Sequence, residues 1–422
     1  MACYSPKICV EMNNCQSSPF IPLAYVGSVV PDQPAFHSIA FSRAGNMFQE
    51  NLLTALSEAG LPPDLILSQQ PLRAFPNSTT LWKAKSQCQL TSGLDVQLVP
   101  FLNLPFLRPL TVGLAVIFEL FKWGWFYRKL PCKVIYTFNL TEPPGLFTFL
   151  AAKLIHAKLI ASISDINIPG ETIPLTLSRK IDYWLQKKLI PRLDGLVVVS
   201  KKIIQDFAPE KPFVRLEGAI NPLVIQHFSQ SVRPPKSDTL FTIVATGSLD
   251  EANGFRELLA AMALLPAHYQ LRIAGAGPLQ FLIQQQAAQD PRIEYLGYLS
   301  FDQVLTMYDS ADVLINMRLT QRMHTAYFFP SKMMEYLASG VPVITTSTGH
   351  IEDEYADFTF LLQEETPEAL AQLIEQIAQL PRAIRLEKGR AAQSFIQDHN
   401  TWQVQGEKLA DFIHARLINS EK

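Results

Sequence analysis

Short apolar runs alternate with amphipathic stretches along most of the chain. In the first half, runs with the length of buried strands occur at 23–30, 65–67, 96–99, 134–138, 159–163 and 196–199. Apolar residues at helical spacing lie between several of them, at 47–59, 145–156 and 178–189. Strands that alternate with helices in this way predict a parallel α/β layer.

The alternation starts again after residue 240. Strand-like runs occur at 241–246, 270–274, 293–295, 313–315 and 343–345, and helical patterns at 255–264 and 367–378. Between the two halves, the segment 221–238 is polar and contains prolines, as linkers do. Because 422 residues also exceed what a single hydrophobic core serves, the pattern predicts two α/β domains.

The breaks in the pattern set the expected boundaries. We expect a poorly ordered leader at 1–20, a first domain at 21–222, a linker at 223–238 and a second domain at 239–398. The last segment, 399–422, contains an amphipathic helix over 402–417. The leader holds Glu11 and other polar residues where a secretory signal needs an apolar core, so we expect no signal peptide.

Composition and charge limit the classes of function that the protein can have. A net charge of −2 argues against a general nucleic-acid binder, which would show a basic surplus. The five cysteines form no paired CxxC spacing and no cluster with histidine. This favours reduced thiols in a cytoplasmic protein over a disulfide framework or a zinc site.

One segment of the second half combines an anion site with a hydroxyl acceptor. Pro330 and Ser331 begin a predicted helix over 332–338, where proline suits an early position and the serine side chain can cap. A glycine and a buried strand follow. Lys332 places a positive charge at the helix start, where unpaired N–H groups also favour phosphate. One turn later, Glu335 can accept hydrogen bonds from sugar hydroxyls, so the pair suits a nucleotide-diphosphate ligand.

These residues also carry a family resemblance. From Phe329, the pattern Phe-Pro-Ser-Lys-x-x-Glu-Tyr-x-x-x-Gly-x-Pro-Val resembles the donor-site segment of bacterial family-4 glycosyltransferases. It is most similar to members that build capsular polysaccharides, exopolysaccharides or glycolipids. The likeness continues through 349–355 and, less densely, over most of the chain. It implies the GT-B fold, in which two Rossmann-like parallel-sheet domains face each other across a cleft. In that fold the terminal helix, here within 399–422, crosses back to the first domain.

The resemblance implies a donor site on the second domain. Its expected residues are Gly247, Gly275, Gly277, Arg318, Ser331, Lys332 and Glu335. Of these, Lys332 and Arg318 are expected to act in catalysis by compensating charge on the leaving diphosphate. The glycines would let the backbone approach the nucleotide. Because no Asp-x-Asp-like motif lies in a suitable loop, we expect no metal and no cofactor, with the nucleotide sugar as substrate.

Two departures from the family pattern concern the same site. Tyr327 stands where many members carry a second glutamate. Ser248 and Asn253 stand where many members carry an arginine and a lysine. These losses leave Lys332 and Arg318 to hold the phosphates.

The first domain offers residues for the acceptor side. Asp165 follows a predicted strand that faces the expected cleft, where many relatives carry a histidine. We expect it to orient an acceptor hydroxyl or to stabilise positive charge at the anomeric carbon, in a catalytic role. The alternative is an aspartate that caps the next loop. Gly45 and Asn46 begin the first predicted helix, whose amino terminus we expect at the cleft.

Residues 109–129 form a second informative stretch. One broad apolar face of the helical wheel holds Leu110, Leu114, Ile117, Phe118, Phe121 and Trp125. The surrounding segment 105–158 has a clear excess of lysine and arginine over acids. Such a helix suits an anionic membrane surface, which would make the protein peripheral on the inner face of the plasma membrane. The alternative is a buried core helix of the first domain.

The main hypothesis is a hexosyltransferase-type glycosyltransferase that is metal-independent and, as the resemblance implies, retaining. It would move a sugar from a nucleotide-diphosphate donor to a glycan or lipid-linked acceptor, and cleft closure would exclude water. The expected partners are the donor, the acceptor and a membrane surface, and no nucleic acid. The alternatives are a non-catalytic GT-B scaffold that binds nucleotide or glycan, and a sugar-nucleotide epimerase or hydrolase.

Overall fold

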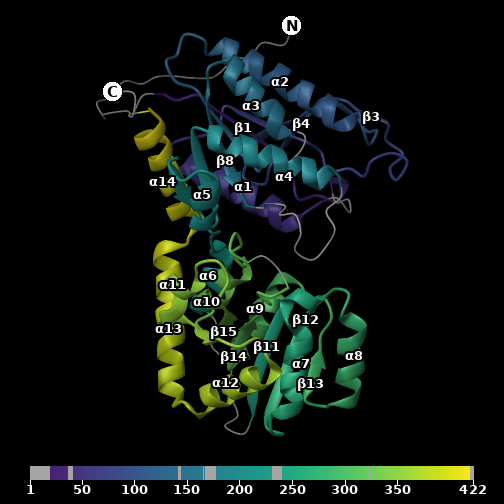
Figure 1. Cartoon of the computed structure of the whole chain (residues 1–422), viewed down its shortest axis with the longest axis vertical. Coiled ribbons are helices and arrows are strands. Elements are labelled where there is room, and N and C mark those ends of the chain that lie inside the picture. Colours follow the sequence, from purple (N-terminus) through teal and green to yellow (C-terminus); the bar gives the residue numbers. More distant parts are fainter. Residues whose placement is uncertain are drawn as a thin grey trace.

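The computed structural model describes residues 20–36, 41–140, 144–164, 166, 177–230, 240–322 and 325–418 of the chain. These residues form two domains stacked along the long axis of the molecule (Figure 1). Apart from Phe20, the expected leader lies outside the described residues.

The first domain is built on a mostly parallel sheet. Its strands are β1 (Leu23–Gly27), β2 (Leu65–Ser68), β3 (Trp82–Lys83), β4 (Ser86–Gln89), β5 (Asp95–Leu98), β6 (Phe101–Leu102), β7 (Val134–Phe138), β8 (Lys158–Ile163), β9 (Gly195–Val198) and β10 (Phe213–Arg215). Its helices are α1 (Arg43–Glu58), α2 (Arg108–Phe126), α3 (Pro144–Leu154), α4 (Leu177–Leu189) and α5 (Lys201–Phe207).

Strand order in this sheet is β10-β9-β8-β7-β1-β2-β5-β4, as far as the chain is described. Neighbouring strands run parallel except β4 and β5, and β3 pairs separately with β6. The central strands β1 and β7 are buried along nearly their whole length. Because helices cover both faces of the sheet, the sequences of these two strands are continuous and largely apolar.

The second domain repeats the architecture. Its strands are β11 (Phe241–Ser248), β12 (Tyr269–Ala276), β13 (Ile293–Tyr295), β14 (Val313–Asn316), β15 (Val343–Thr346) and β16 (Phe360–Leu362). Its helices are α6 (Pro222–Gln230), α7 (Phe255–Leu264), α8 (Gln280–Gln289), α9 (Phe301–Asp309), α10 (Lys332–Ala338), α11 (Ile351–Tyr355), α12 (Pro367–Gln379) and α13 (Arg382–His399).

All strand pairs of this second sheet are parallel, in the order β13-β12-β11-β14-β15-β16 within the described residues. The chain leaves β11 for β12 on one side and later returns to β14 on the other. The strand order therefore reverses between β11 and β14, and open α/β sheets bind ligands at such a switch point.

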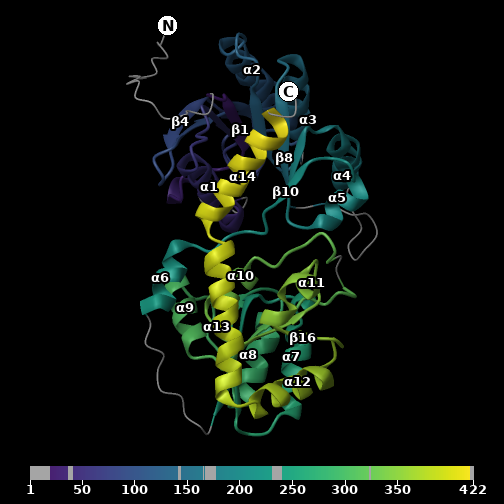
Figure 2. The same ribbon diagram turned by 90° about the vertical axis from the view of Figure 1, so that its left-hand side faces the viewer.

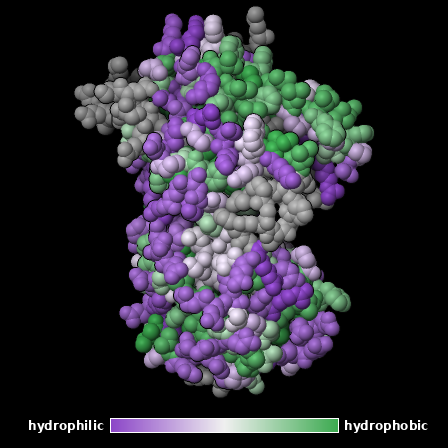
Figure 3. All heavy atoms as spheres, viewed as in Figure 1, coloured by the Kyte–Doolittle hydropathy of each residue, from purple (hydrophilic) through white to green (hydrophobic). Residues whose placement is uncertain are grey.

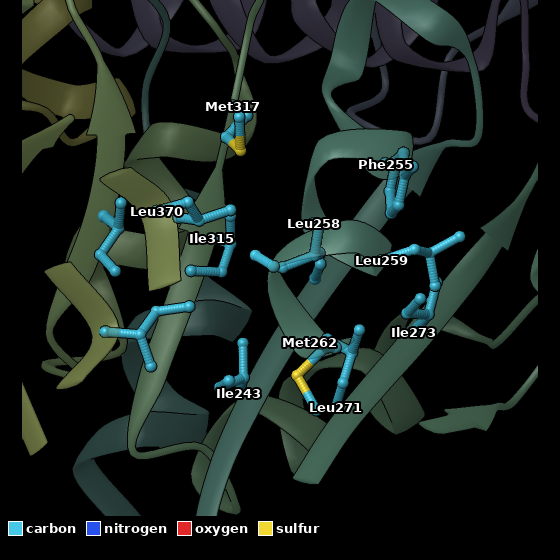
Figure 4. Packing of buried hydrophobic residues seen from close by; sticks show 14 of the residues in the cluster. Ile243, Phe255, Leu258, Leu259, Met262, Leu271, Ile273, Ile315, Met317 and Leu370 are labelled. Carbon is cyan, nitrogen blue, oxygen red and sulfur yellow. The ribbon is translucent and has the colours of Figure 1, made fainter. Parts of the chain in front are cut away.

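Apolar packing fixes α7 against this sheet. Phe255, Leu258 and Met262 recur at helical spacing on α7 and are buried. They pack in one cluster with Ile243 of β11 and Leu271 of β12 (Figure 4). The turn that precedes α7 is thereby held at the carboxyl edge of the sheet, beside the switch point.

The first helix begins earlier than its pattern predicts. The prediction places its start near Gly45, whereas α1 begins at Arg43. The cause is Ser42, whose extended backbone and hydroxyl cap the helix, with the Gly45 N–H donating to Ser42 Oγ at 3.2 Å.

The segment expected as a linker starts with a helix. Asn221 caps α6, its side-chain oxygen accepting from the Leu223 N–H at 2.9 Å, and Pro222 occupies an early position. Val224 is fully buried and packs in a core cluster of the second domain. A polar, proline-containing stretch therefore concealed a short helix, while 231–239 lie outside the described residues.

The last described helices link the second domain to the first. Helix α13 runs along the second domain, and α14 (Trp402–Phe412) continues it onto the first (Figure 2). There Trp402 meets Phe48 edge-to-face, with ring centroids 5.4 Å apart. Gly406 allows close contact with α1, since a Cβ at this position would lie 2.4 Å from the carbonyl oxygen of Ala55. Contacts of α14 therefore bind the two domains together.

Candidate donor site

Helix α10 begins at the switch point with Lys332, as the sequence predicts, but Ser331 does not cap it with its side chain. Ser331 is itself helical, at φ −54 and ψ −33, whereas a capping serine needs an extended backbone. The Ser331 side chain is exposed. The capping role predicted for Ser331 is therefore wrong, and its hydroxyl is available to a ligand.

Lys332 reaches from α10 to the end of β11. Its Nζ donates to Thr246 Oγ1 at 3.3 Å. The next residue, Gly247, has φ +143, a region that disfavours side chains, and a Cβ there would lie 3.4 Å from Lys332 Nζ. Gly247 thus leaves open backbone beside the ammonium group.

Burial weakens the positive charge of this lysine. It lowers the pKa of Lys332 to about 8, with Glu335 opposing the shift and Arg318 adding to it. Burial also raises the pKa of Glu335, against the attraction of Lys332. The two side chains lie one turn apart on α10, so each partly compensates the desolvation of the other.

Two buried tyrosine hydroxyls hold Thr246, the hydrogen-bond partner of Lys332, in place. Thr246 Oγ1 lies 2.9 Å from the Tyr308 hydroxyl and 3.0 Å from the Tyr336 hydroxyl. Both tyrosines are at most 1% exposed, and burial raises the pKa of each. They hold Thr246 in place as a neutral partner for the ammonium. Local sequence patterns predict no such role for either tyrosine, although Tyr336 follows Glu335 directly in the motif.

Arg318 follows β14 and is anchored through its backbone. Its N–H donates to Thr346 Oγ1 at 3.0 Å, and Thr346 Oγ1 donates back to the Arg318 carbonyl at 2.9 Å. The guanidinium donates to Asn253 Oδ1 and lies 5.7 Å from the ring centroid of Phe328. Burial lowers the pKa of Arg318, with the nearby charge of Asp250 opposing. Arg318 is thus held at the switch point, close enough to Lys332 to influence its charge.

Asn253 acquires a structural role from this contact. Besides accepting from Arg318, its amide donates to the Ser248 carbonyl at 2.7 Å. Asn253, which stands where many family members carry a basic residue, therefore orients Arg318. A small pocket lies at this point and is lined by Ala245, Thr246, Asn253, Gly254, Phe255, Leu258, Ile315, Asn316, Met317 and Arg318.

The two other predicted glycines pack the ends of β11 and β12 together. A Cβ at Gly275 would lie 1.9 Å from the carbonyl oxygen of Gly247, and one at Gly277 would lie 2.5 Å from that of Leu249. Tyr295 also donates to the Gly275 carbonyl at 2.9 Å. Gly275 therefore shapes the loop that carries Gly247.

Tyr327 makes a contact between the domains. Its hydroxyl donates to Asp206 of α5 at 2.6 Å, and its ring lies 5.6 Å from that of Phe207. Next to it, Ser200 Oγ donates to the Ala326 carbonyl at 2.8 Å. The position where many relatives carry a glutamate is thus used here to join the loop before α10 to the first domain.

The first-domain candidates are placed differently. Asp165 lies outside the described residues. Asn46 is buried, and both ends of its amide are bonded to the backbone of Val30, at 2.8 and 2.9 Å. Gly45 donates its N–H to Ser42. The described contacts of Asn46 and Gly45 hold the first turn of α1. The predicted residues that the structure brings together are those of the second domain, at the switch point of its sheet.

An ionic cluster joins the domains beside α11. Arg215 Nε lies 2.5 Å from Glu217 Oε1, and the same guanidinium pairs with Glu354. His350 Nε2 lies 2.8 Å from Glu217 Oε1, and Tyr355 donates to Glu217. Glu217, His350 and Glu354 have the donor atoms of a metal site, all within 4.8 Å of one another. Arg215 already compensates both carboxylates, so the cluster fits a structural junction better than a cation.

Comparison with known proteins finds a family match in the second domain. Residues 241–379 match the family model described as glycosyl transferases group 1. Over 195 residues, 44% of this chain, the sequence is 28% identical to WcaL of Escherichia coli (strain K12), which is provisionally named a colanic acid biosynthesis glycosyltransferase. The match spans 48% of WcaL, so the chain covers about half the length of this relative.

Solved structures share the whole fold. Sucrose-phosphate synthase from Thermosynechococcus elongatus has a TM-score of 0.68 at 15% identity, over 94% of this chain and 100% of that chain. HepE from Anabaena, solved with UDP and glucose, has a TM-score of 0.62 at 12% identity, over the same shares. The chain therefore has the GT-B fold, and its second domain matches the family model of the glycosyl transferases group 1.

Proposed function

We propose that this protein is a glycosyltransferase that moves a sugar from a nucleotide-diphosphate donor to a glycan or lipid-linked acceptor. The observation that carries the proposal is the convergence of Lys332, Arg318 and Gly247 at the switch point of the second sheet. Two basic groups beside open backbone suit a diphosphate. The match of this domain to group 1 glycosyltransferases supports the same function.

Each donor-site residue has a role in this proposal. Lys332 and Arg318 compensate the charge that develops on the leaving diphosphate, which makes the reaction independent of metal. Ser331 offers its exposed hydroxyl to the phosphates. Glu335 accepts from the ribose hydroxyls in its ionised form, which Lys332 favours. The resemblance to family 4 supports a retaining outcome.

The acceptor side of the proposal rests on Asp165. In the sequence, Asp165 comes two residues after the end of β8. In this proposal its carboxylate would orient the acceptor hydroxyl or stabilise positive charge at the anomeric carbon. The WcaL similarity supports an acceptor used in polysaccharide synthesis. HepE, which binds UDP, makes UDP the first donor nucleotide to test.

A nucleotide-binding scaffold is the second candidate. Two observations favour it: Tyr327 is committed to Asp206, and Asn253 holds the guanidinium of Arg318. Both reduce the number of groups that can meet a donor. An epimerase or hydrolase on the same fold would use the same donor contacts without a sugar acceptor.

Ligand-induced stabilisation tests the donor site. Melting curves are recorded with UDP, GDP, ADP and their sugar conjugates, for the wild type, Lys332→Ala and the control Lys388→Ala. Lys388 is a matched control because it is another partly buried lysine of the second domain, bonded to the Ala356 carbonyl. A ligand at about 100 times its dissociation constant stabilises by about 2.7 kcal/mol. We expect one nucleotide to stabilise the wild type and the control, and not Lys332→Ala.

Turnover separates the candidate functions. Nucleotide release that needs an added glycan or lipid-linked acceptor supports the transferase. Release without acceptor indicates a hydrolase, and tight nucleotide binding without release under any acceptor indicates the scaffold. A wild type that no nucleotide stabilises would overturn the proposed donor site.

A further inference from the structure

Helix α2 lies on the first domain with its apolar stripe facing outward. The side packed on the domain consists of Val112, Val116, Leu120 and Trp123. The opposite side is solvent-exposed at Leu110 (47%), Leu114 (54%), Phe118 (61%), Phe121 (48%) and Trp125 (61%). These five side chains recur at helical spacing, so they form one continuous stripe. Large apolar surfaces of this kind mark binding sites.

The inner side of α2 is firmly attached to the domain. A Cβ at Gly113 would lie 2.1 Å from the ring of Phe147 on α3, and one at Gly124 would lie 2.7 Å from Ile155, the residue after α3. Glu119 also points inward and pairs with Lys85 at 2.9 Å. By length and composition, α2 could cross a membrane, with a mean hydropathy of 1.2. Its packing against α3 and the inward ion pair fit a helix that lies flat instead.

Two neighbouring helices extend the apolar stripe. Helix α3, which packs along α2, exposes Leu150 (43%) and Leu154 (63%). Helix α4 exposes Leu177 (74%), Ile181 (43%) and Trp184 (58%) on one side. Figure 3 shows hydrophobic residues gathered over the part of the first domain where Figure 1 draws α2, α3 and α4. We call these exposed residues of the three helices the lipid face.

Every exposed charge described on these helices and just after α2 is positive. The exposed basic residues are Lys122, Arg128, Lys129, Lys153, Lys180, Lys187 and Lys188. The acids described in α2, α3 and α4 are Glu119 and Asp182, and both are buried. The lipid face is therefore apolar with a basic fringe.

The basic side chains lie along the aromatic ones. Lys122 Nζ is 5.2 Å from the ring centroid of Phe118, and the Arg128 guanidinium is 4.8 Å from that of Trp125. Lys153 Nζ is 5.5 Å from the ring of Phe149 on α3. Such pairs keep the charged group at the level of a polar interface while the ring and the aliphatic stem contact an apolar phase.

We propose that the lipid face docks the protein on a membrane with anionic lipids, with α2 lying in the plane of the interface. Exposed Trp, Phe and Leu side chains would enter the boundary between headgroups and acyl chains, and the basic fringe would meet anionic headgroups. Charge complementarity selects this occupant. In a symmetric dimer through the same face, the lysines and arginines of one copy would meet those of the other. The docking does not rest on the transfer reaction, since no donor-site residue takes part.

Vesicle flotation tests the docking with the full chain. The vesicles are phosphatidylcholine alone, or phosphatidylcholine mixed with phosphatidylglycerol, at low and high salt. One variant removes apolar contacts, Phe118→Ser with Phe121→Ser and Trp125→Ser, and another reverses charges, Lys122→Glu with Arg128→Glu and Lys129→Glu. The control changes exposed apolar residues of the second domain, Leu264→Ser with Phe281→Ser and Ile384→Ser.

We expect the wild type and the control to float with the anionic vesicles and to be released by salt. The charge-reversal variant should partition on the order of 100-fold more weakly, given the contribution of each basic residue near the surface. The emission of Trp125 and Trp184 should shift to the blue on binding. Melting curves establish that the variants are folded. The charge variant alters exposed side chains, but Lys122 also pairs with the buried Glu119 at 3.4 Å, so this variant is compared with the wild type only after its melting curve shows that it is folded.

Three outcomes would overturn the inference. The first is a wild type that does not float with anionic vesicles. The second is a folded charge-reversal or serine variant that floats as the wild type does. The third is a wild type that is a dimer by light scattering while the serine variant is a monomer, because the apolar stripe would then be covered by a second copy.

Discussion

Burial lowers the pKa of Lys332, so the charge of this candidate donor-site residue can be followed by titration. The ammonium group is held by the neutral hydroxyl of Thr246 and shares its surroundings with Arg318 and Glu335. Because desolvation disfavours the charged form, the pKa of Lys332 is lowered to about 8. A lysine with this pKa changes its charge in an accessible pH range.

Nucleotide affinity should therefore depend on pH through Lys332. A diphosphate binds the protonated form, so affinity should fall by up to about tenfold per pH unit above 8. In the free protein, the unfolded chain binds more protons between about pH 8 and 10.4, so the free energy of unfolding should rise with pH across that window. Calorimetric titration with UDP and melting curves check both trends. Lys332→Gln should lose the pH dependence of affinity and the contribution of Lys332 to the stability trend, and Lys388→Gln should keep both.

The Gly275→Ala variant should lose stability because of a backbone clash. Gly275 has φ +146, and its Cβ would lie 1.9 Å from the Gly247 carbonyl oxygen. Gly93→Ala is the control, because it has φ +83 but meets nothing within 4 Å. We expect Gly93→Ala to cost about 1–2 kcal/mol from backbone strain alone. Chemical denaturation should show a larger loss for Gly275→Ala, and equal losses would contradict the close packing of β11 and β12 at this point.

At the scale of elements, the orientation of α2 shows what a helical pattern leaves open. The wheel predicts the stripe that contains Leu114, Phe118 and Trp125, and a buried core helix would place that stripe inside. The structure places Val116 and Leu120 inside and the predicted stripe outside. Both sides of α2 are apolar. The side that carries Gly113 and Gly124 faces inward, because these glycines leave room for α3 and the residue after it.

The Gly113→Val variant should separate α2 from α3. The new side chain would start 2.1 Å from the Phe147 ring, so an overpacking cost of about 1–3 kcal/mol is expected. The adjacent Leu114→Ala change should stay within about 0.5 kcal/mol, because Leu114 is exposed. Chemical denaturation measures both. A large loss for Leu114→Ala would mean that the stripe is buried and that α2 does not face outward with this side.

The whole molecule is held together by contacts between the domains. Arg215 links Glu217 and Glu354, and Tyr327 donates to Asp206. Helix α14 adds apolar contact with α1, and thereby returns the chain to the first domain. The domains are thus joined by both ionic and apolar contacts.

The ionic junction should weaken in acid. The hydrogen bonds from Arg215 hold the pKa of Glu354 below its usual value, so its stabilisation is present above the ordinary glutamate pKa of about 4.3 and is lost as pH falls through the folded value. The melting temperature of Glu354→Gln should therefore be lower than that of the wild type at neutral pH, and the difference should vanish in acid. Glu352→Gln, on the same helix but bonded to Ser347, is the control. A difference that persists unchanged in acid would argue against an ionic contribution.

Much of the candidate donor site could be located from the sequence because its residues lie close together in the chain. Lys332 and Glu335 lie one helical turn apart, so one motif carries both. Arg318 could also be proposed from the sequence, because it lies just after a predicted strand. The partners of these residues could not be predicted. Thr246, Tyr308 and Asn253 come from separate segments, and only the folded sheet brings their side chains together.

By itself, the sequence determined two α/β domains, most strand and helix positions, and a glycosyltransferase-like donor motif, because periodicity and short motifs are local properties of the chain. Tertiary structure alone decided that α6 occupies the expected linker and that Tyr327 and Arg215 join the domains. It also decided which side of α2 faces outward. These features depend on contacts between residues far apart in the chain, which packing selects and local patterns do not encode.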